Sequence, residues 1–397
     1  MDAAFGGFER GRIRLSALAA EAALSLMGYT SLRPLPPPRL AIPHGMAHPD
    51  DLWRQIDTIP REQRDESAFA STIRMTKHDV WRKLADQVAG MAGIGPTPRH
   101  LQVIQASMPS GRAPLHGLFS PPEAARPWVI VVHGLYDSKL SRYAVLLAQA
   151  LIRQGFGVLL PDMRWHGCLL SRDWLPTLGI EEALDLLEWG RWLKRSHPGH
   201  PIGLLGCSIG GLDVIHALSQ VEAGEVLQAG GIAISPPASL RRTLDTLDGA
   251  ASFWTLGMDA VLRKFFQQAL GTRMRALGIG RNGAGCFAQF LDWLVSRLNR
   301  GPEFTSSRFL DLADPGSRLP ACQRPLLMLV SRNDPIYREP TAARLVEQAM
   351  GNAFVRVIET PGGGHIGQPG IYPQWMAEIL NQFFSLAAGV SGPPTTR

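Results

Sequence analysis

One serine of the sequence has neighbours that suit a nucleophile. Ser208 lies between Gly206 and Gly210 in the segment LLGCSIGG, with an apolar run before it and a helical pattern after it. A sharp turn from strand to helix strains the residue at its apex, and the residues two positions away must be nearly free of side chains. The spacing therefore predicts that the Ser208 hydroxyl is displayed above a strand end, where it can attack a carbonyl carbon.

The neighbouring cysteine is the other nucleophile of this segment. The residues two positions from Cys207 are Leu205 and Ile209, so glycine spacing does not serve it. We interpret Cys207 as a small residue of the buried core.

A serine hydroxyl needs a base, and the base needs a carboxylate that fixes its tautomer. His365 lies in the glycine-rich segment ETPGGGHIG after the last predicted strand, and Asp334 follows the preceding strand in SRNDPIY. We therefore predict Ser208 as nucleophile, His365 as base and Asp334 as the orienting acid. Asp245, which follows an earlier strand, is the alternative acid, and His166 is the alternative base.

The elements that must position these residues alternate along the chain. Amphipathic helical patterns at 142–154, 180–196 and 209–220 lie between short apolar runs. Candidate strands cover 100–107, 114–120, 128–134, 157–162, 202–208, 230–235, 325–331 and 354–360. Short, nearly all-apolar strands separated by helices are typical of a mostly parallel sheet covered on both faces. The fold class predicted is a doubly wound α/β fold.

The other segments divide the chain around this core, which we place at 99–239 and 319–388. Residues 1–98 are predicted to form an N-terminal helical extension with a proline-rich connector, and 389–397 a flexible tail. Residues 240–318 look helical throughout and predict a cap or lid. Aromatic residues of this cap and of the loop after 128–134 are predicted to contact an apolar substrate, namely Tyr136, Trp254, Phe265 and Phe266.

Composition excludes several classes of protein. With 397 residues, 45% hydrophobic and 19% charged, the chain has the balance of a globular protein. The net charge of +6 comes without a basic run, so no nucleic-acid partner is expected. The four cysteines are not closely paired and no HExxH motif occurs, so no disulfide framework, metal or cofactor is expected.

The N-terminus bears on localisation. Arginines precede the apolar run Leu15–Tyr29, which contains Glu21 and is too short to span a bilayer. We interpret it as an amphipathic helix that makes a peripheral membrane contact or docks on the protein, with a cleaved signal peptide as the alternative. The expected location is the cytoplasm, with a position at the membrane periphery as the alternative.

The motifs VVHG, PDMRWHG, GCSIGG, SRNDP and GGGHIG resemble those of the α/β-hydrolase superfamily, and Pro127 to Leu386 is similar to its catalytic domain. The likeness is greatest to serine esterases, lipases and acyl hydrolases. The N–H of Ile209, next to the nucleophile, is expected to hold the oxyanion. The resemblance implies that Leu135 supplies the second donor, although Asp137 stands where an HGxxG pattern has its last glycine.

The function predicted is hydrolysis of carboxylic esters through an acyl-enzyme, on a small-molecule ester or lipid with a medium or long acyl chain. The same three residues would also suit acyl transfer to an alcohol or cleavage of an amide or peptide. A different class of function, a non-catalytic ligand-binding or scaffold protein on a hydrolase fold, is a further alternative.

Overall fold

The computed structural model describes most of the predicted core and parts of the rest. The described residues are 35, 48–62, 98–123, 125–249, 267, 270–271, 273–275, 286–298, 300–334, 336–337 and 341–389. The predicted N-terminal helix at 15–29 and the last eight residues of the predicted tail, 390–397, lie outside them.

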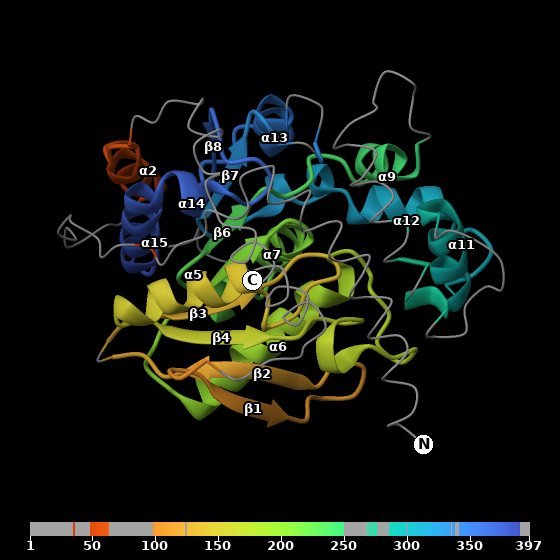
Figure 1. The fold of residues 1–397 in the computed structure, drawn as a ribbon, viewed down its shortest axis with the longest axis horizontal. Coiled ribbons are helices and arrows are strands. Elements are labelled where there is room, and N and C mark those ends of the chain that lie inside the picture. Colours follow the sequence, from red (N-terminus) through yellow and green to blue (C-terminus); the bar gives the residue numbers. More distant parts are fainter. Residues whose placement is uncertain are drawn as a thin grey trace, which may run out of the picture.

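Eight strands form one sheet (Figure 1). They are β1 (Gln102–Ala106), β2 (Leu115–Ser120), β3 (Trp128–Val132), β4 (Gly157–Pro161), β5 (Ile202–Cys207), β6 (Gly231–Ile234), β7 (Leu326–Ser331) and β8 (Val355–Thr360). Their order is β1-β2-β4-β3-β5-β6-β7-β8. β2 pairs antiparallel with β1 and β4, and the strands from β4 to β8 pair in parallel. The predicted doubly wound, mostly parallel sheet is confirmed.

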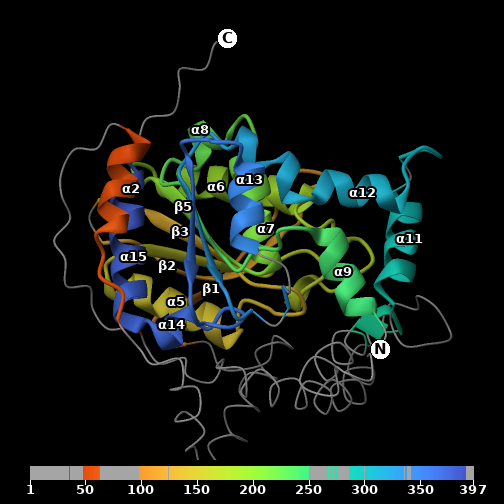
Figure 2. The same cartoon turned by 90° about the horizontal axis from the view of Figure 1, so that it is seen from above.

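Helices cover both faces of this sheet (Figure 2). α5 (Arg142–Arg153) and α15 (Pro373–Ala387) pack on one face, and α6 (Ile180–Ser196), α7 (Ile209–Leu218) and α13 (Thr341–Ala349) pack on the other. Successive side chains of a strand point to opposite faces, so Val129 and Val131 join the first core while Ile130 and Val132 join the second. Burial on both faces explains why these strands are apolar without alternation.

The described part of the N-terminal extension is attached to the core. Its helix α2 (Pro49–Asp57) packs against α15. The Trp53 ring stacks on Phe383 with the ring centres 6.2 Å apart, and the indole N–H donates to the Ala353 carbonyl at 2.7 Å. This segment therefore packs on α15, the helix that covers one face of the sheet, as Figure 1 shows.

The described helices of the long segment between β6 and β7, which we call the insertion, lie at one end of the molecule (Figures 1 and 2). Its described helices are α9 (Leu240–Asp248), α11 (Phe287–Leu298) and α12 (Ser306–Ala313). Their apolar faces form a third buried cluster with Tyr136 and Trp165, from the loops after β3 and β4. The insertion thus packs directly on the loops at the carboxyl edge of the sheet.

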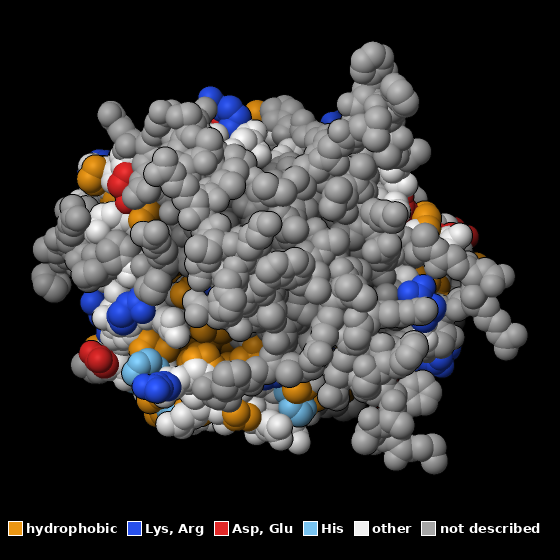
Figure 3. Space-filling view, in the orientation of Figure 1, with side chains coloured by type: hydrophobic (Ala, Val, Ile, Leu, Met, Phe, Trp, Pro, Cys, Tyr) orange, Lys and Arg blue, Asp and Glu red, His pale blue; other side chains and the backbone are white. Residues whose placement is uncertain are grey.

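Figure 3 shows the Lys and Arg side chains that are visible among the described residues at separate places around the margin of this face. Six large apolar side chains are exposed among the described residues, which is ordinary for a globular protein. Among the described helices, none has the length and apolar character needed to cross a membrane.

Candidate active site

The turn between β5 and α7 displays Ser208. Its backbone has φ 56° and ψ −122°, which is strained for a residue with a side chain. A Cβ at Gly206 would lie 2.0 Å from the carbonyl oxygen of Gly210, and a Cβ at Gly210 would lie 2.4 Å from that of His133. Both positions therefore require glycine for steric reasons, as the spacing predicts.

The structure brings Ser208, His365 and Asp334 together. The Ser208 Oγ lies 2.9 Å from His365 Nε2, and His365 Nδ1 lies 2.8 Å from Asp334 Oδ2. A carboxylate only accepts hydrogen bonds, so Nδ1 carries the proton and Nε2 is left to accept from the serine hydroxyl. The His365 and Asp334 side chains are buried. This is the geometry in which a neutral imidazole can remove the serine proton.

The loops that carry the acid and the histidine are fastened to each other. The second carboxylate oxygen of Asp334 accepts from the main-chain N–H of Ile336 at 2.9 Å, which fixes the carboxylate plane. The Asn333 side chain accepts from the Gly364 N–H at 2.9 Å, next to His365. These contacts connect the loop after β7 with the loop after β8.

The alternative acid and base lie elsewhere. Asp245 is an exposed residue of α9. His166 is buried and donates from Nδ1 to the Arg164 carbonyl at 2.5 Å, and burial lowers its pKa well below the usual range. Within the described part of the chain neither side chain hydrogen-bonds to Ser208, so the geometry favours Asp334 and His365.

The two residues whose main-chain N–H groups are predicted to hold an oxyanion, Ile209 and Leu135, lie at the cavity beside Ser208. Ile209 is the first residue of α7, where a helix leaves its N–H without an internal acceptor. Leu135 follows Gly134 in the loop after β3, and both Leu135 and Ile209 line the same cavity as Ser208. Among the described residues no acceptor takes either N–H.

Asp137 holds the loop after β3 in place of the glycine that the HGxxG pattern has there. Its carboxylate accepts from the Tyr143 hydroxyl at 2.7 Å and from Ser141 Oγ at 2.9 Å. The Tyr143 hydroxyl in turn accepts from the Gly134 N–H at 2.6 Å. The departure from the family pattern therefore replaces a flexible residue by a hydrogen-bonded anchor.

We expect Asp137 to make stability depend on pH. Burial raises its pKa from about 3.8 to about 6, against the opposing hydrogen bonds from Tyr143 and Ser141. The folded state therefore holds this proton more tightly than the unfolded chain does. This difference in proton affinity adds at most about 3 kcal/mol to the free energy of unfolding. The contribution is complete below pH 4 and is lost as the pH rises through 6.

Asp137→Asn should remove this dependence. Chemical denaturation of both proteins between pH 4 and 8 gives the difference in unfolding free energy, which should shift in favour of the variant as the pH rises from 4 to 6. Asp173→Asn, at an exposed site, is the control. A difference that stays constant over this range would contradict the prediction.

A buried polar layer, formed by His133, Lys139 and the segment PDMRWHG, supports the loops beneath the site. His133 donates from Nδ1 to the Gly134 carbonyl at 2.9 Å and accepts from the Met163 N–H at 3.1 Å. Burial lowers the pKa of His133 to about 4, so the ring is neutral near pH 7. Asp162 binds the Lys139 ammonium, and Arg164 binds Asp185 through two hydrogen bonds of 2.5 and 2.9 Å.

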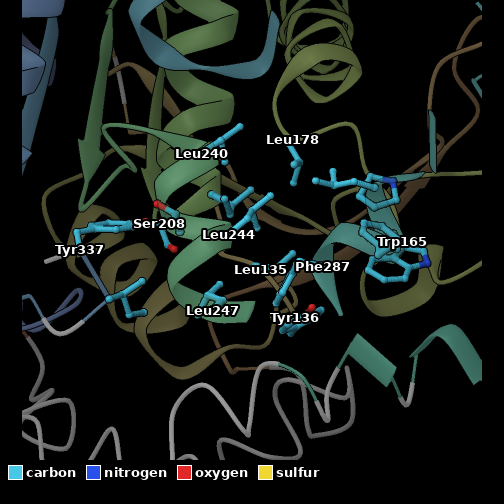
Figure 4. Close-up of a pocket in the computed structure, with 16 residues that line it drawn as sticks. Leu135, Tyr136, Trp165, Leu178, Ser208, Leu240, Leu244, Leu247, Phe287 and Tyr337 are labelled. Atoms are coloured by element: carbon cyan, nitrogen blue, oxygen red, sulfur yellow. The ribbon is translucent and has the colours of Figure 1, made fainter. Parts of the chain in front are cut away.

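An apolar cavity opens beside Ser208 (Figure 4). Its empty volume is about 610 Å³, part of it open to solvent. It is lined by Leu135, Tyr136, Trp165, Pro176, Leu178, Ser208, Ile209, Leu240, Thr243, Leu244, Leu247, Phe287, Phe290, Leu291, Ile336 and Tyr337. The structure thus places Tyr136 at the cavity, whereas Trp254, Phe265 and Phe266 lie outside the described residues.

Sequence reasoning missed two aromatic residues of this cavity. Tyr337 packs edge-on against the His365 ring with the ring centres 5.2 Å apart, and it lines the cavity together with Ser208. Its position three residues after Asp334 was the available signal. Trp165 stacks on Phe290 at 5.0 Å between ring centres and closes the far side of the cavity.

Comparison with known proteins agrees with this architecture. Two crystal forms of the Pyrococcus furiosus esterase Pf2001 are among the matching structures. One has a TM-score of 0.51 and 20% identity, covering 74% of this chain and 97% of the esterase chain; the other has 0.53 and 18%, covering 90% and 99%. A puromycin-hydrolyzing peptidase of Mycobacterium tuberculosis has a TM-score of 0.48 and 16% identity, covering 75% and 42%. At these identities the esterase shares the fold.

No match was found among curated proteins. A family model described as the alpha/beta hydrolase family matches residues 129–379, which include Ser208, Asp334 and His365 and amount to more than half of the chain. The chain therefore belongs to the alpha/beta hydrolase family.

Proposed function

We propose that the protein is a serine hydrolase of carboxylic esters with medium or long acyl chains. The observation that carries the proposal is the hydrogen-bonded series from Ser208 through His365 to Asp334, at the wall of an apolar cavity. A buried carboxylate that orients a neutral imidazole toward a serine hydroxyl is the arrangement that acyl transfer through an acyl-enzyme needs.

The first half of the reaction forms the acyl-enzyme. Ser208 Oγ bonds to the ester carbonyl carbon while its proton passes to His365 Nε2 and an electron pair moves onto the carbonyl oxygen. The N–H groups of Leu135 and Ile209 hold the resulting oxyanion, and each such donor contributes about 3 to 4 kcal/mol. Collapse of this intermediate breaks the bond to the alcohol, which leaves with the proton from His365.

Water completes the cycle. It attacks the acyl carbon and gives a proton to His365, and the second intermediate releases the carboxylic acid as Ser208 regains its proton. Asp334 stays ionised throughout and stabilises the imidazolium that forms twice in each cycle. The Tyr337 ring covers one side of His365 and limits the access of solvent to it.

The cavity supports an apolar acyl group as the substrate. Apart from Ser208, its lining is aliphatic or aromatic except for Thr243 and the tyrosine hydroxyls. Burying an acyl chain contributes about 0.8 kcal/mol per methylene, so specificity should increase with chain length until the cavity is full.

Labelling with a fluorophosphonate tests the activated serine. We expect covalent attachment at Ser208, identified by mass spectrometry of the digested protein, and no attachment in Ser208→Ala. Heat-denatured protein is the control for non-specific reaction. Absence of labelling in the folded wild-type protein would contradict the proposal and favour a binding or scaffold role.

Substrate profiles test the acyl pocket. Leu244 of α9 is buried at the cavity, so Leu244→Trp should fill part of it and move the maximum of kcat/KM to shorter acyl chains. The loss for the longest substrates should be about tenfold or more, because two or more methylenes lose their burial. Leu312→Trp on α12, where the leucine is exposed, is the matched control. Equal profiles for both variants would place the acyl chain elsewhere.

A further inference from the structure

One arginine of the insertion connects three segments at the edge of the sheet. Arg273, between α9 and α11, donates from one guanidinium nitrogen to the Trp165 carbonyl at 2.7 Å and from the other to the Tyr136 carbonyl at 2.9 Å. The same guanidinium lies 4.9 Å from the Tyr136 ring centre and 5.5 Å from that of Trp165. It therefore contacts the loops after β3 and β4 through both main chain and rings.

Both residues that Arg273 holds have a backbone conformation that side chains disfavour. Tyr136 has φ 68° and Trp165 has φ 64°. Residues other than glycine stay in this region only where the surroundings hold them there. The two carbonyl hydrogen bonds and the two ring contacts of Arg273 supply such a restraint at both positions.

The restraint bears on the oxyanion site through the adjacent residue. Leu135 directly precedes Tyr136, so the direction of the Leu135 N–H depends on the conformation of this short loop. The hydrogen bond between Asp137 and Tyr143 also anchors this loop. Arg273 adds a hydrogen bond from the insertion to the Tyr136 carbonyl. Burial lowers the pKa of Arg273 only to about 10, so it is charged near pH 7.

We propose that Arg273 is a positioning residue for the oxyanion site: by holding the Tyr136 and Trp165 carbonyls, it keeps the Leu135 N–H directed at the space beside Ser208. The proposal rests on the proposed serine hydrolase function. It makes the oxyanion site complete only while the insertion is docked on the sheet edge. The insertion then contributes to the chemical step as well as to the acyl pocket.

Arg273→Ala tests this role in the full chain. We expect kcat for a medium-chain ester to fall about 100-fold, the effect of losing one oxyanion donor, with KM changed less than threefold. The affinity for a trifluoromethyl ketone, which forms an oxyanion on Ser208, should fall by a similar factor. Methylguanidinium ions should restore part of the kcat, whereas urea at the same concentration should not.

Arg241→Ala is the matched control. Arg241 belongs to the same insertion and donates to the Ser307 carbonyl at 3.2 Å and to Asp311 at 2.9 Å, on the exposed side of α9 and α12. Its removal should leave kcat within twofold and show no response to methylguanidinium. Should Arg273→Ala fail to fold, Arg273→Lys keeps the charge but not the paired donors, and the same fall in kcat is expected.

Hydrogen exchange separates this proposal from the proposed function, because it does not require turnover. In Arg273→Ala the peptide that contains Leu135 and Tyr136 should exchange at least fivefold faster than in wild type, and in Arg241→Ala it should not. If Arg273→Ala exchanges faster but the wild-type protein neither reacts with a fluorophosphonate nor hydrolyses esters, the proposed hydrolase function is refuted and the contact made by Arg273 is not. Unchanged exchange and kcat in Arg273→Ala would refute the role of Arg273.

Discussion

Replacing Ser208 by alanine is expected to lower kcat for ester hydrolysis by about 10⁴-fold or more. The residual rate is that which substrate binding and the oxyanion donors supply without a nucleophile. The fold should persist, because the alanine Cβ occupies the place of the serine Cβ and the packing around Gly206 and Gly210 is unchanged. Initial rates with a chromogenic medium-chain ester, beside a thermal unfolding curve, measure both expectations.

Ser219→Ala is the matched control for this experiment. Ser219 lies at the other end of α7 and its hydroxyl donates to the His216 carbonyl at 2.8 Å, so its loss affects only the end of the helix. We expect its kcat to stay within twofold of wild type. Retained turnover in Ser208→Ala would mean that another group, or a contaminating enzyme, hydrolyses the ester.

The fold could be predicted from the sequence because burial on two faces makes each strand a short apolar run. All eight candidate strands are confirmed, and the pattern at 180–196 matches α6 in both bounds. Strand ends in a parallel sheet share one edge, so the order of strands already placed Ser208, Asp334 and His365 near one another. Their separation of less than 3 Å depends on loops such as that of Asn333 and Gly364.

Long-range contacts could not be predicted, because nothing local in the sequence encodes them. In the sequence Arg273 is one basic residue of a segment with a helical pattern. In the structure it hydrogen-bonds to the carbonyls of Tyr136 and Trp165, which are more than 100 positions away in the chain. Asp137 differs, because its partners Ser141 and Tyr143 follow it closely in the chain. The family pattern, which has a glycine at this position, gave no reason to expect these hydrogen bonds.

The second large effect is expected from Asp334→Asn, which keeps the shape of the side chain and removes its charge. An amide can present its N–H₂ group to His365 Nδ1 and so stabilise the tautomer with the proton on Nε2, which cannot accept from Ser208. Loss of the carboxylate also removes the stabilisation of the imidazolium that forms in the reaction. We expect kcat near pH 7 to fall about 10⁴-fold, with KM changed little.

Asp245→Asn distinguishes the two acids that the sequence left open. Asp245 is exposed on α9 and makes no hydrogen bond to His365 within the described structure, so its replacement should leave kcat within twofold. Parallel measurement of kcat and KM for both variants, with fluorophosphonate labelling rates as a second readout, decides between them. A large loss of kcat in Asp245→Asn with full activity in Asp334→Asn would show that Asp245 is the orienting acid. A fall of only a few-fold in Asp334→Asn would mean that the 2.8 Å contact between Asp334 and His365 positions the ring but does not govern its tautomer.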